Sequence, residues 1–175
     1  MNNLQVKLRL PYCLRSVLPV LIIVLSVLSC GEDDGKKKDY TFKDQDAQGK
    51  IAGNNWTYAS GKFRYSDDGE SIYITLYNAT EDPVCATSAT AFIDISFPAE
   101  PGLQEIANPG FPPVVVLLHE LTVDTGAGPY MGVGKKGAVE ILTITDTEVT
   151  GRMDVRESNN TSVNGNFSVS FCPEI

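Results

Sequence analysis

The chain has 175 residues and a formal net charge of −8, from 14 basic and 22 acidic residues. A protein that binds nucleic acid needs positive surface opposite the phosphates, so this charge balance disfavours a nucleic-acid partner. One histidine and four cysteines make a poor ligand set for a metal ion, and we expect neither a metal nor a cofactor.

The first 30 residues have the pattern of a secretory signal. Three basic residues, Lys7, Arg9 and Arg15, precede an apolar stretch from Val17 to Leu28. A membrane-spanning helix needs about 20 apolar residues, so this stretch is too short to be one. The run Val27-Leu28-Ser29-Cys30 resembles the lipobox of bacterial lipoproteins at all four positions. That resemblance implies cleavage before Cys30 and lipidation of its thiol, which would anchor the chain to a membrane through its acyl groups.

Two other interpretations of the first 30 residues remain open, an ordinary secretory signal in which Cys30 is incidental and a short anchor helix. Cleavage before Cys30 would remove three basic residues and no acid, which takes the net charge from −8 to −11. The next residues, Gly31-Glu32-Asp33-Asp34-Gly35, resemble the export tag of Bacteroidetes lipoproteins. This resemblance implies display on the outer face of the outer membrane, with the periplasmic leaflet as the alternative. The polar composition of residues 30–48 predicts a disordered acidic tether.

Residues 49–175 predict one all-β domain, either an antiparallel sandwich or a flattened barrel of about eight strands. Apolar and polar residues alternate with a period of two, which indicates antiparallel strands with one face on a core. The predicted strands are Gly49–Ala52, Asn55–Tyr65, Ser71–Asn78, Thr90–Phe97, Val114–Val123, Gly137–Thr145, Glu148–Arg156 and Val163–Phe171.

Two connections and one strand segment have distinct patterns. Residues 157–162 are polar and predict a hairpin loop between the last two strands. The connection Pro98–Pro113 is rich in proline and allows at most a helical turn at Gly102–Ala107. The run Val114–Leu118 is apolar without alternation, and we expect it to be buried on both faces or covered.

Two cysteines remain once Cys13 leaves with the signal and Cys30 is lipidated. In an oxidising compartment an even pair predicts a disulfide, here Cys85–Cys172. The alternative is two separate buried thiols, because free cysteine packs like a small apolar residue.

The opening Gly49-Lys50-Ile51-Ala52-Gly53-Asn54-Asn55-Trp56 resembles that of a family of small Bacteroidetes lipoproteins. Members also end in paired Gly-x-Phe-like strands and a late cysteine, which correspond here to Gly151, Gly165 and Cys172. Met153 replaces the aromatic residue of the first strand. The resemblance implies an all-β fold and an envelope location, and it implies no activity.

One short motif suggests chemistry. The run Val123-Asp124-Thr125-Gly126-Ala127 resembles the active-site loop of retroviral-type aspartic proteases, in which two chains each supply one aspartate. Asp124 would then be the catalytic residue of a homodimer, with Thr125 and Gly126 bracing the loop. The supporting strand that the protease family needs is poorly replaced by Val149-Thr150-Gly151. A simple turn at the end of a strand explains the same residues.

Four tyrosines are candidate ligand-binding residues, and we expect Trp56 to fill the core. An aromatic platform for sugar rings would use Tyr65, Tyr73, Tyr77 and Tyr130. His119-Glu120 lacks the second histidine of a zinc helix, so we expect His119 at a sheet edge. The sequence therefore predicts a non-enzymatic, lipid-anchored binding protein with a glycan or protein ligand. The aspartic protease is the alternative, and a purely structural role in the envelope is also open.

Overall fold

The computed structural model describes residues 38–79, 85, 89–106 and 114–173. The predicted signal, Cys30 and the acidic run that follows it lie outside these residues. The described part contains eleven strands and no helix, and so no helix that could cross a membrane. The strands are β1 (Gln48–Ile51), β2 (Asn54–Thr57), β3 (Ser60–Tyr65), β4 (Ser71–Tyr77), β5 (Ala91–Pro98), β6 (Gly102–Glu105), β7 (Val115–Asp124), β8 (Pro129–Val133), β9 (Lys136–Ile144), β10 (Glu148–Ser158) and β11 (Thr161–Phe171).

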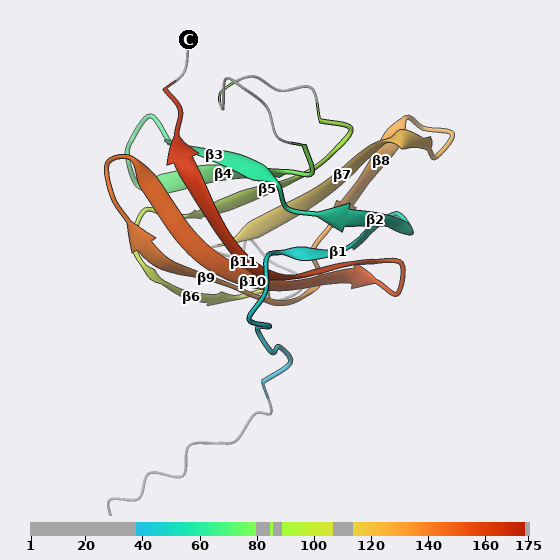
Figure 1. Ribbon diagram of the computed structural model, residues 1–175, viewed down its shortest axis with the longest axis horizontal. Helices are drawn as coiled ribbons and strands as arrows, with labels where there is room; N and C mark the ends of the chain where they lie inside the picture. The colour runs from blue at the N-terminus through green and yellow to red at the C-terminus, as the bar shows by residue number, and fades with distance from the viewer. Residues whose placement is uncertain (1–37, 80–84, 86–88, 107–113, 174–175) are drawn as a thin grey trace, which may run out of the picture. The chain divides into compact units, whose positions relative to one another are not determined.

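The strands form one strongly curled sheet, a half-barrel, in the order β6-β9-β10-β11-β3-β4-β5-β7-β8 (Figure 1). The short strands β1 and β2 lie off this path, with β1 paired to β11. All pairs are antiparallel except β11 with β3, where Ser170 lies beside Lys62 and Phe171 beside Phe63. The predicted all-β, antiparallel fold is confirmed: the strands form one strongly curled half-barrel, with eleven strands instead of about eight.

The predicted secondary structure differs from the observed one in three places. The predicted strand Asn55–Tyr65 is two strands, because the chain changes partner between them: Tyr58 N donates to Ala47 O, and Ala59 N donates to Tyr77 O. The predicted helical turn at Gly102–Ala107 is wrong, since β6 pairs with β9 there. Strand β8 was not predicted, because its five residues include a proline and a glycine.

The core lies on the inner face of the half-barrel. Its largest side chains come from several strands, and Trp56, Phe63 and Phe97 are each 1 % exposed. Trp56 fills the core as expected, and its ring N–H donates to Ala91 O at 3.3 Å. The expectation for Val114–Leu118 is wrong for Val115, which is 38 % exposed because β7 alternates like the other strands.

The segment Lys38–Ala47, which we call the strap, packs against the outer face of β10 and β11. Thr41 N donates to the Asp154 carboxylate at 2.9 Å, and Lys43 N donates to Asn164 Oδ1 at 2.9 Å. Ala47 N donates to Asn166 O at 2.8 Å, and Asn166 N donates to Gln45 O at 2.7 Å. The strap is thus held by three polar residues of β10 and β11: Asp154, Asn164 and Asn166.

The strap corrects the prediction of a tether that is disordered as far as Gln48. Composition gave few apolar residues to bury, whereas the strap is held by polar contacts with another part of the chain. Asp154, which is only 8 % exposed, accepts the bond from Thr41 and lies 3.6 Å from Arg156 Nε. The Arg152 guanidinium lies over the Phe42 ring, 4.5 Å from its centroid. The predicted tether at residues 30–37 lies outside the described part of the chain.

Candidate functional site

The outer face of β3, β4, β5 and β7 carries polar and aromatic side chains that alternate with the core residues. The strand register places these side chains in three rows across the sheet. The first row is Arg64, Tyr73, Ser96 and Val115; the second is Lys62, Thr75, Asp94 and Leu117; the third is Tyr77, Phe92 and His119. We call these three rows the β3–β7 face.

Asp94 is the centre of a polar network on the β3–β7 face. One carboxylate oxygen accepts a hydrogen bond of 2.8 Å from the Thr75 hydroxyl. The other lies 3.3 Å from Nε2 of His119, at an angle that leaves this buried nitrogen without a good hydrogen bond in the described residues. The Asp94 side chain keeps 40 % exposure, so the carboxylate retains acceptor capacity toward solvent or a ligand.

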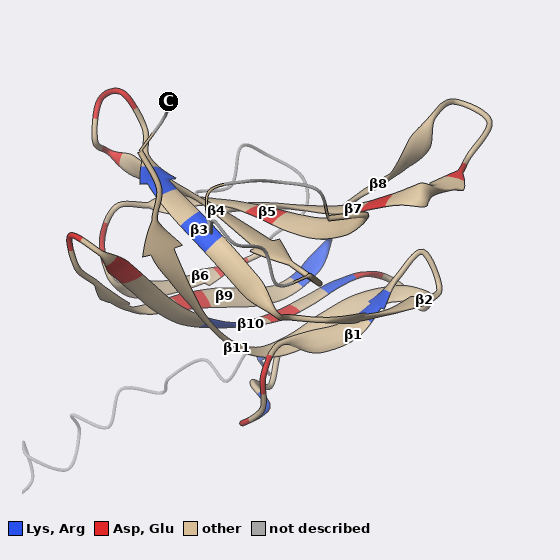
Figure 2. Ribbon diagram, turned by 45° about the horizontal axis from the view of Figure 1, so that its top comes forward, with Lys and Arg blue, Asp and Glu red and all other residues tan. Residues whose placement is uncertain are grey.

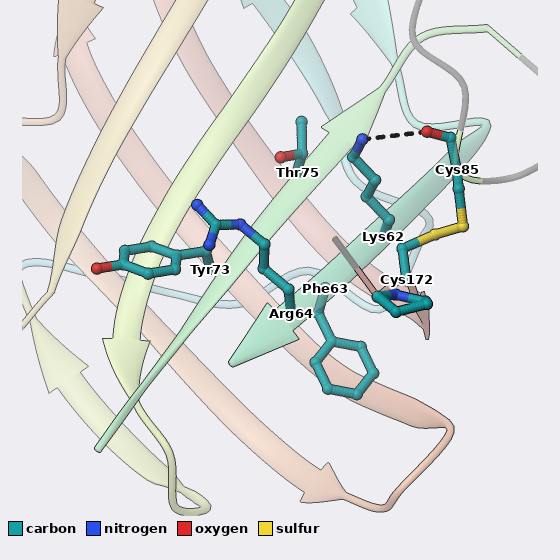
Figure 3. Close-up of a pocket in the computed structure, with 8 residues that line it drawn as sticks. Lys62, Phe63, Arg64, Tyr73, Thr75, Cys85 and Cys172 are labelled. Atoms are coloured by element: carbon teal, nitrogen blue, oxygen red, sulfur yellow. Dashed lines mark hydrogen bonds between the residues drawn. A yellow bond between two sulfur atoms is a disulfide. The ribbon is translucent and has the colours of Figure 1, made fainter. Parts of the chain in front are cut away.

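The first row places a cation on an aromatic ring. The Arg64 guanidinium carbon lies 4.6 Å from the centroid of the Tyr73 ring, within the range of a cation–π contact. Tyr73 is 40 % exposed, so one face of this stack is open to solvent. Figure 3 shows the Tyr73 ring beside the Arg64 guanidinium, with Lys62 directed toward Cys85.

The third row is aromatic and lies next to the polar second row on the same face. The rings of Phe92 and His119 are parallel within 11°, with centroids 4.3 Å apart. The Tyr77 ring centroid lies 6.4 Å from that of Phe92, and Tyr77 is only 4 % exposed. Lys62 Nζ is 5.9 Å from the Tyr77 ring centroid. This row fixes His119 in place and supplies an apolar floor next to the network of Asp94.

Three adjoining hollows make the β3–β7 face a shallow groove. Their volumes are about 220, 300 and 420 Å³, and Arg64 and Thr75 line all three. The first hollow is closed on one side by the disulfide, the second by Val115 and Leu117 of β7. A groove of this size, with an apolar floor and a few polar groups, has the character of a small-ligand site.

The groove differs in charge from the rest of the molecule. The chain as a whole is acidic, yet Lys62 and Arg64 lie two residues apart on β3, where Figure 2 draws both segments in blue. Asp94 is the acid that lines the groove with them. A ligand in the groove therefore meets two positively charged side chains and one carboxylate acceptor.

The predicted disulfide is confirmed, and it borders this groove. Cys85 and Cys172 are bonded across a sequence separation of 87 residues. The Cys85 carbonyl accepts a long hydrogen bond of 3.4 Å from Lys62 Nζ. The bridge thus ties Cys85 to the end of β11 and positions its carbonyl at the rim of the groove.

The four predicted tyrosines do not form one platform. Tyr73 and Tyr77 lie on the β3–β7 face, although Tyr77 is buried. Tyr65 points to the opposite face, where its ring contacts Phe63 and Phe171 at centroid distances of 5.8 and 6.3 Å. Tyr130 is on β8.

The Tyr130 hydroxyl is hydrogen-bonded to other side chains of the domain. Its hydroxyl lies 2.9 Å from Thr161 Oγ1 and donates to the Glu157 carboxylate at 3.2 Å. Burial raises the pKa of this phenol above its usual value. The hydroxyl is therefore engaged with the hairpin of β10 and β11, and the Tyr130 side chain packs against the core on the inner face, not on the β3–β7 face.

The Asp-Thr-Gly motif forms the turn between β7 and β8. Asp124 Oδ1 accepts a hydrogen bond of 2.8 Å from Gly126 N, and Thr125 Oγ1 donates to Gly128 O at 2.9 Å. All three residues of the predicted catalytic loop, Asp124, Thr125 and Gly126, are exposed. This is the turn that the alternative interpretation predicted, and its geometry gives the protease interpretation no support.

Sequence reasoning missed Arg64, Thr75 and Asp94 in the groove and the place of His119 beside Asp94 on the β3–β7 face. The signal was present as polar residues at every second position of β3, β4 and β5, but the pairing register that brings them together was not readable from the sequence. No cluster of three or more potential metal ligands occurs among the described residues. The sequence matches no family model, and neither a curated protein nor a solved structure matches the chain.

Proposed function

We propose that this chain is a lipid-anchored protein of the bacterial cell envelope whose β domain binds a glycan, without catalysis, in the groove of the β3–β7 face. The observation that carries the proposal is the meeting of Arg64, Tyr73 and Asp94 in one open groove. The lipobox pattern before Cys30 and the acidic run after it support the location, on the outer surface of the outer membrane.

The chemistry of the groove suits a sugar. Sugar hydroxyls pair well with a carboxylate acceptor and a guanidinium donor, while the apolar face of a pyranose ring stacks on an aromatic side chain. Asp94, Arg64 and Tyr73 supply these three features on adjacent strands. The side chains sit on a hydrogen-bonded sheet, so little conformational freedom is lost when a ligand binds.

The same groups favour binding over catalysis. The Thr75 hydroxyl donates its hydrogen bond to Asp94 and not to His119, so these three residues do not form a nucleophile–histidine–carboxylate relay. The protease motif lies in an exposed turn on the β7–β8 hairpin. These observations support a binding protein.

A pair of tyrosine variants tests the proposed binding site. Tyr73 and Tyr65 have nearly equal exposure, 40 % and 37 %, but only Tyr73 lies in the groove. The mature chain is screened on a glycan array, and the affinity of the best glycan is measured by calorimetry. Tyr73→Ala should weaken binding by about five- to thirtyfold, since stacking contacts of this kind contribute about 1–2 kcal/mol. Tyr65→Ala is the matched control and should bind normally. Equal losses in both variants, or no glycan bound at all, would refute the proposal.

The location has a separate test. Cys30→Ser should abolish acylation and release the protein from the envelope fraction, whereas Cys13→Ser, inside the predicted signal, should not. Mass spectrometry of the mature N-terminus reads out the acyl groups directly. A Cys30→Ser protein that still sediments with envelopes, with no fatty modification found on the unsubstituted chain, would refute the anchor.

A further inference from the structure

Strand β8 is an open edge of the sheet with an unusual character. It is the last strand in the sheet order, and no strand of the described residues pairs with its outer side. The hairpin of β7 and β8 extends beyond the rest of the curled sheet in both views (Figures 1 and 2). Residues 129–134 carry no charge, and uncharged accessible edges invite pairing with another strand.

The register identifies which main-chain groups are open. Gly134 N donates to Val116 O at 2.9 Å, and Gly132 lies opposite Leu118. In an antiparallel pair every second residue bonds to its partner strand, so the N–H and C=O groups of Met131 and Val133 point away from β7. The edge therefore presents two donors and two acceptors toward an incoming strand.

The side chains at the same positions are apolar and exposed. Met131 is 60 % exposed and Val133 is 48 % exposed. On the same outer side of β7, Val115 is 38 % exposed and Leu121 is 47 % exposed. We call Val115, Leu121, Met131 and Val133 the edge strip. The opposite edge strand, β6, is short and carries Glu105, the kind of charge that discourages pairing.

We propose that β8 pairs with β8 of a second copy of this chain, antiparallel about a two-fold axis at Gly132. Met131 then lies opposite Val133 of the partner subunit, and Val133 opposite Met131 of the partner subunit. Each of these two pairs makes two main-chain hydrogen bonds and one apolar cross-strand contact. The pairing goes beyond the proposed ligand site, which it leaves open on the same face.

Charge favours a second copy over another acidic protein. Asp124 lies near the start of β8 and Lys136 follows its end, so an antiparallel pair brings the acidic end of one copy toward the basic end of the other; the neighbouring Lys135 is already paired with Glu157 of its own chain. Pro129 has no N–H to offer to the partner and limits the pairing to this short stretch. The assembly is then a closed dimer. Its two Asp124 turns lie at opposite ends, so it does not bring two catalytic aspartates together.

Paired cysteines test the register. A chain with Met131→Cys and a differently tagged chain with Val133→Cys are produced together as full-length proteins in a bacterial host, and disulfides are trapped in isolated envelopes. Residues of a hydrogen-bonded antiparallel pair have Cα atoms about 5.5 Å apart, within reach of a disulfide. The mixed pair should cross-link. Leu142→Cys, at 48 % exposure on β9, is the matched control and should not cross-link.

A lysine substitution on β8 tests how much this edge contributes to dimer affinity. Met131→Lys should raise the dimer dissociation constant by at least about tenfold in sedimentation velocity of the detergent-purified chain, because a lysine is placed at the centre of the contact. Leu142→Lys should leave the dimer intact, and unchanged unfolding midpoints show that both variants fold. A chain that is monomeric, a dimer that Met131→Lys does not weaken, or cysteines that capture a different protein would each overturn the proposal.

Discussion

The contribution of the strap to stability can be tested at Gly165, a residue of β11 that lies against the strap. Gly165 has a backbone φ of +141°, a conformation that residues other than glycine rarely adopt. A Cβ added there would lie 2.6 Å from the carbonyl oxygens of both Gln45 and Asp46. Gly165→Ala therefore strains β11 and pushes the strap away from it.

The magnitude follows from the contacts at that point. The backbone strain costs about 1–2 kcal/mol. The two adjacent main-chain bonds, Asn166 N to Gln45 O and Ala47 N to Asn166 O, contribute about 1 kcal/mol each when they are weakened. We expect Gly165→Ala to lower the free energy of unfolding by about 2–4 kcal/mol, measured by urea denaturation.

The control separates strain from displacement of the strap. Gly69 has φ +72° with no atom within 4 Å of an added Cβ, so Gly69→Ala carries strain alone and should cost about 1 kcal/mol. Limited trypsin digestion should cut after Lys43 faster in Gly165→Ala than in Gly69→Ala. Equal stability losses and equal cleavage rates at Lys43 in the two variants would refute the docked strap.

Three further perturbations have defined outcomes. Replacing Cys85 and Cys172 together by serine should lower the free energy of unfolding by about 4 kcal/mol in urea denaturation, because the bridge closes a loop of 87 residues; an unchanged midpoint would contradict this. Burial raises the pKa of Tyr58 above its usual 10.0, so the stability from its neutral phenol is complete below pH 10 and is lost as pH rises through the raised pKa. Ultraviolet titration of tyrosinate with Tyr58→Phe as reference should show this late ionisation, and a normal titration would contradict it. Phe63→Ala should lower the free energy of unfolding by about 3–5 kcal/mol in thermal unfolding, because Phe63 is 1 % exposed and its removal leaves a cavity in the core; a loss below 1 kcal/mol would contradict this.

Local alternation was sufficient to predict most strands, and the exceptions have physical causes. The boundaries of β4, β5, β10 and β11 agree with the predicted strands within two residues, because each buries one face on the core. The strands β6 and β8 are edge strands with few buried residues, so their hydrophobic pattern is weak. The curl of the sheet depends on the pairing of β11 with β3, which no local pattern encodes.

The candidate site was only partly predictable for the same reason. Tyr73 was among the predicted ligand-binding residues, and the disulfide followed from counting cysteines. The partnership of Asp94 with Thr75 and His119 depends on the register of β4, β5 and β7, which the alternation within each strand does not fix. The strap was missed because its stability comes from asparagine and aspartate side chains on β10 and β11, not from apolar composition.

The central claim is that the β3–β7 face binds a glycan. Its most direct test is a titration of the ¹⁵N-labelled mature chain with the best glycan from the array, followed by amide chemical shifts. The account predicts shifts centred on Arg64, Tyr73 and Thr75 of β3 and β4 and on Asp94 of β5. Shifts confined to the strap or to the inner-face residues around Tyr65, with these amides unmoved, would contradict it.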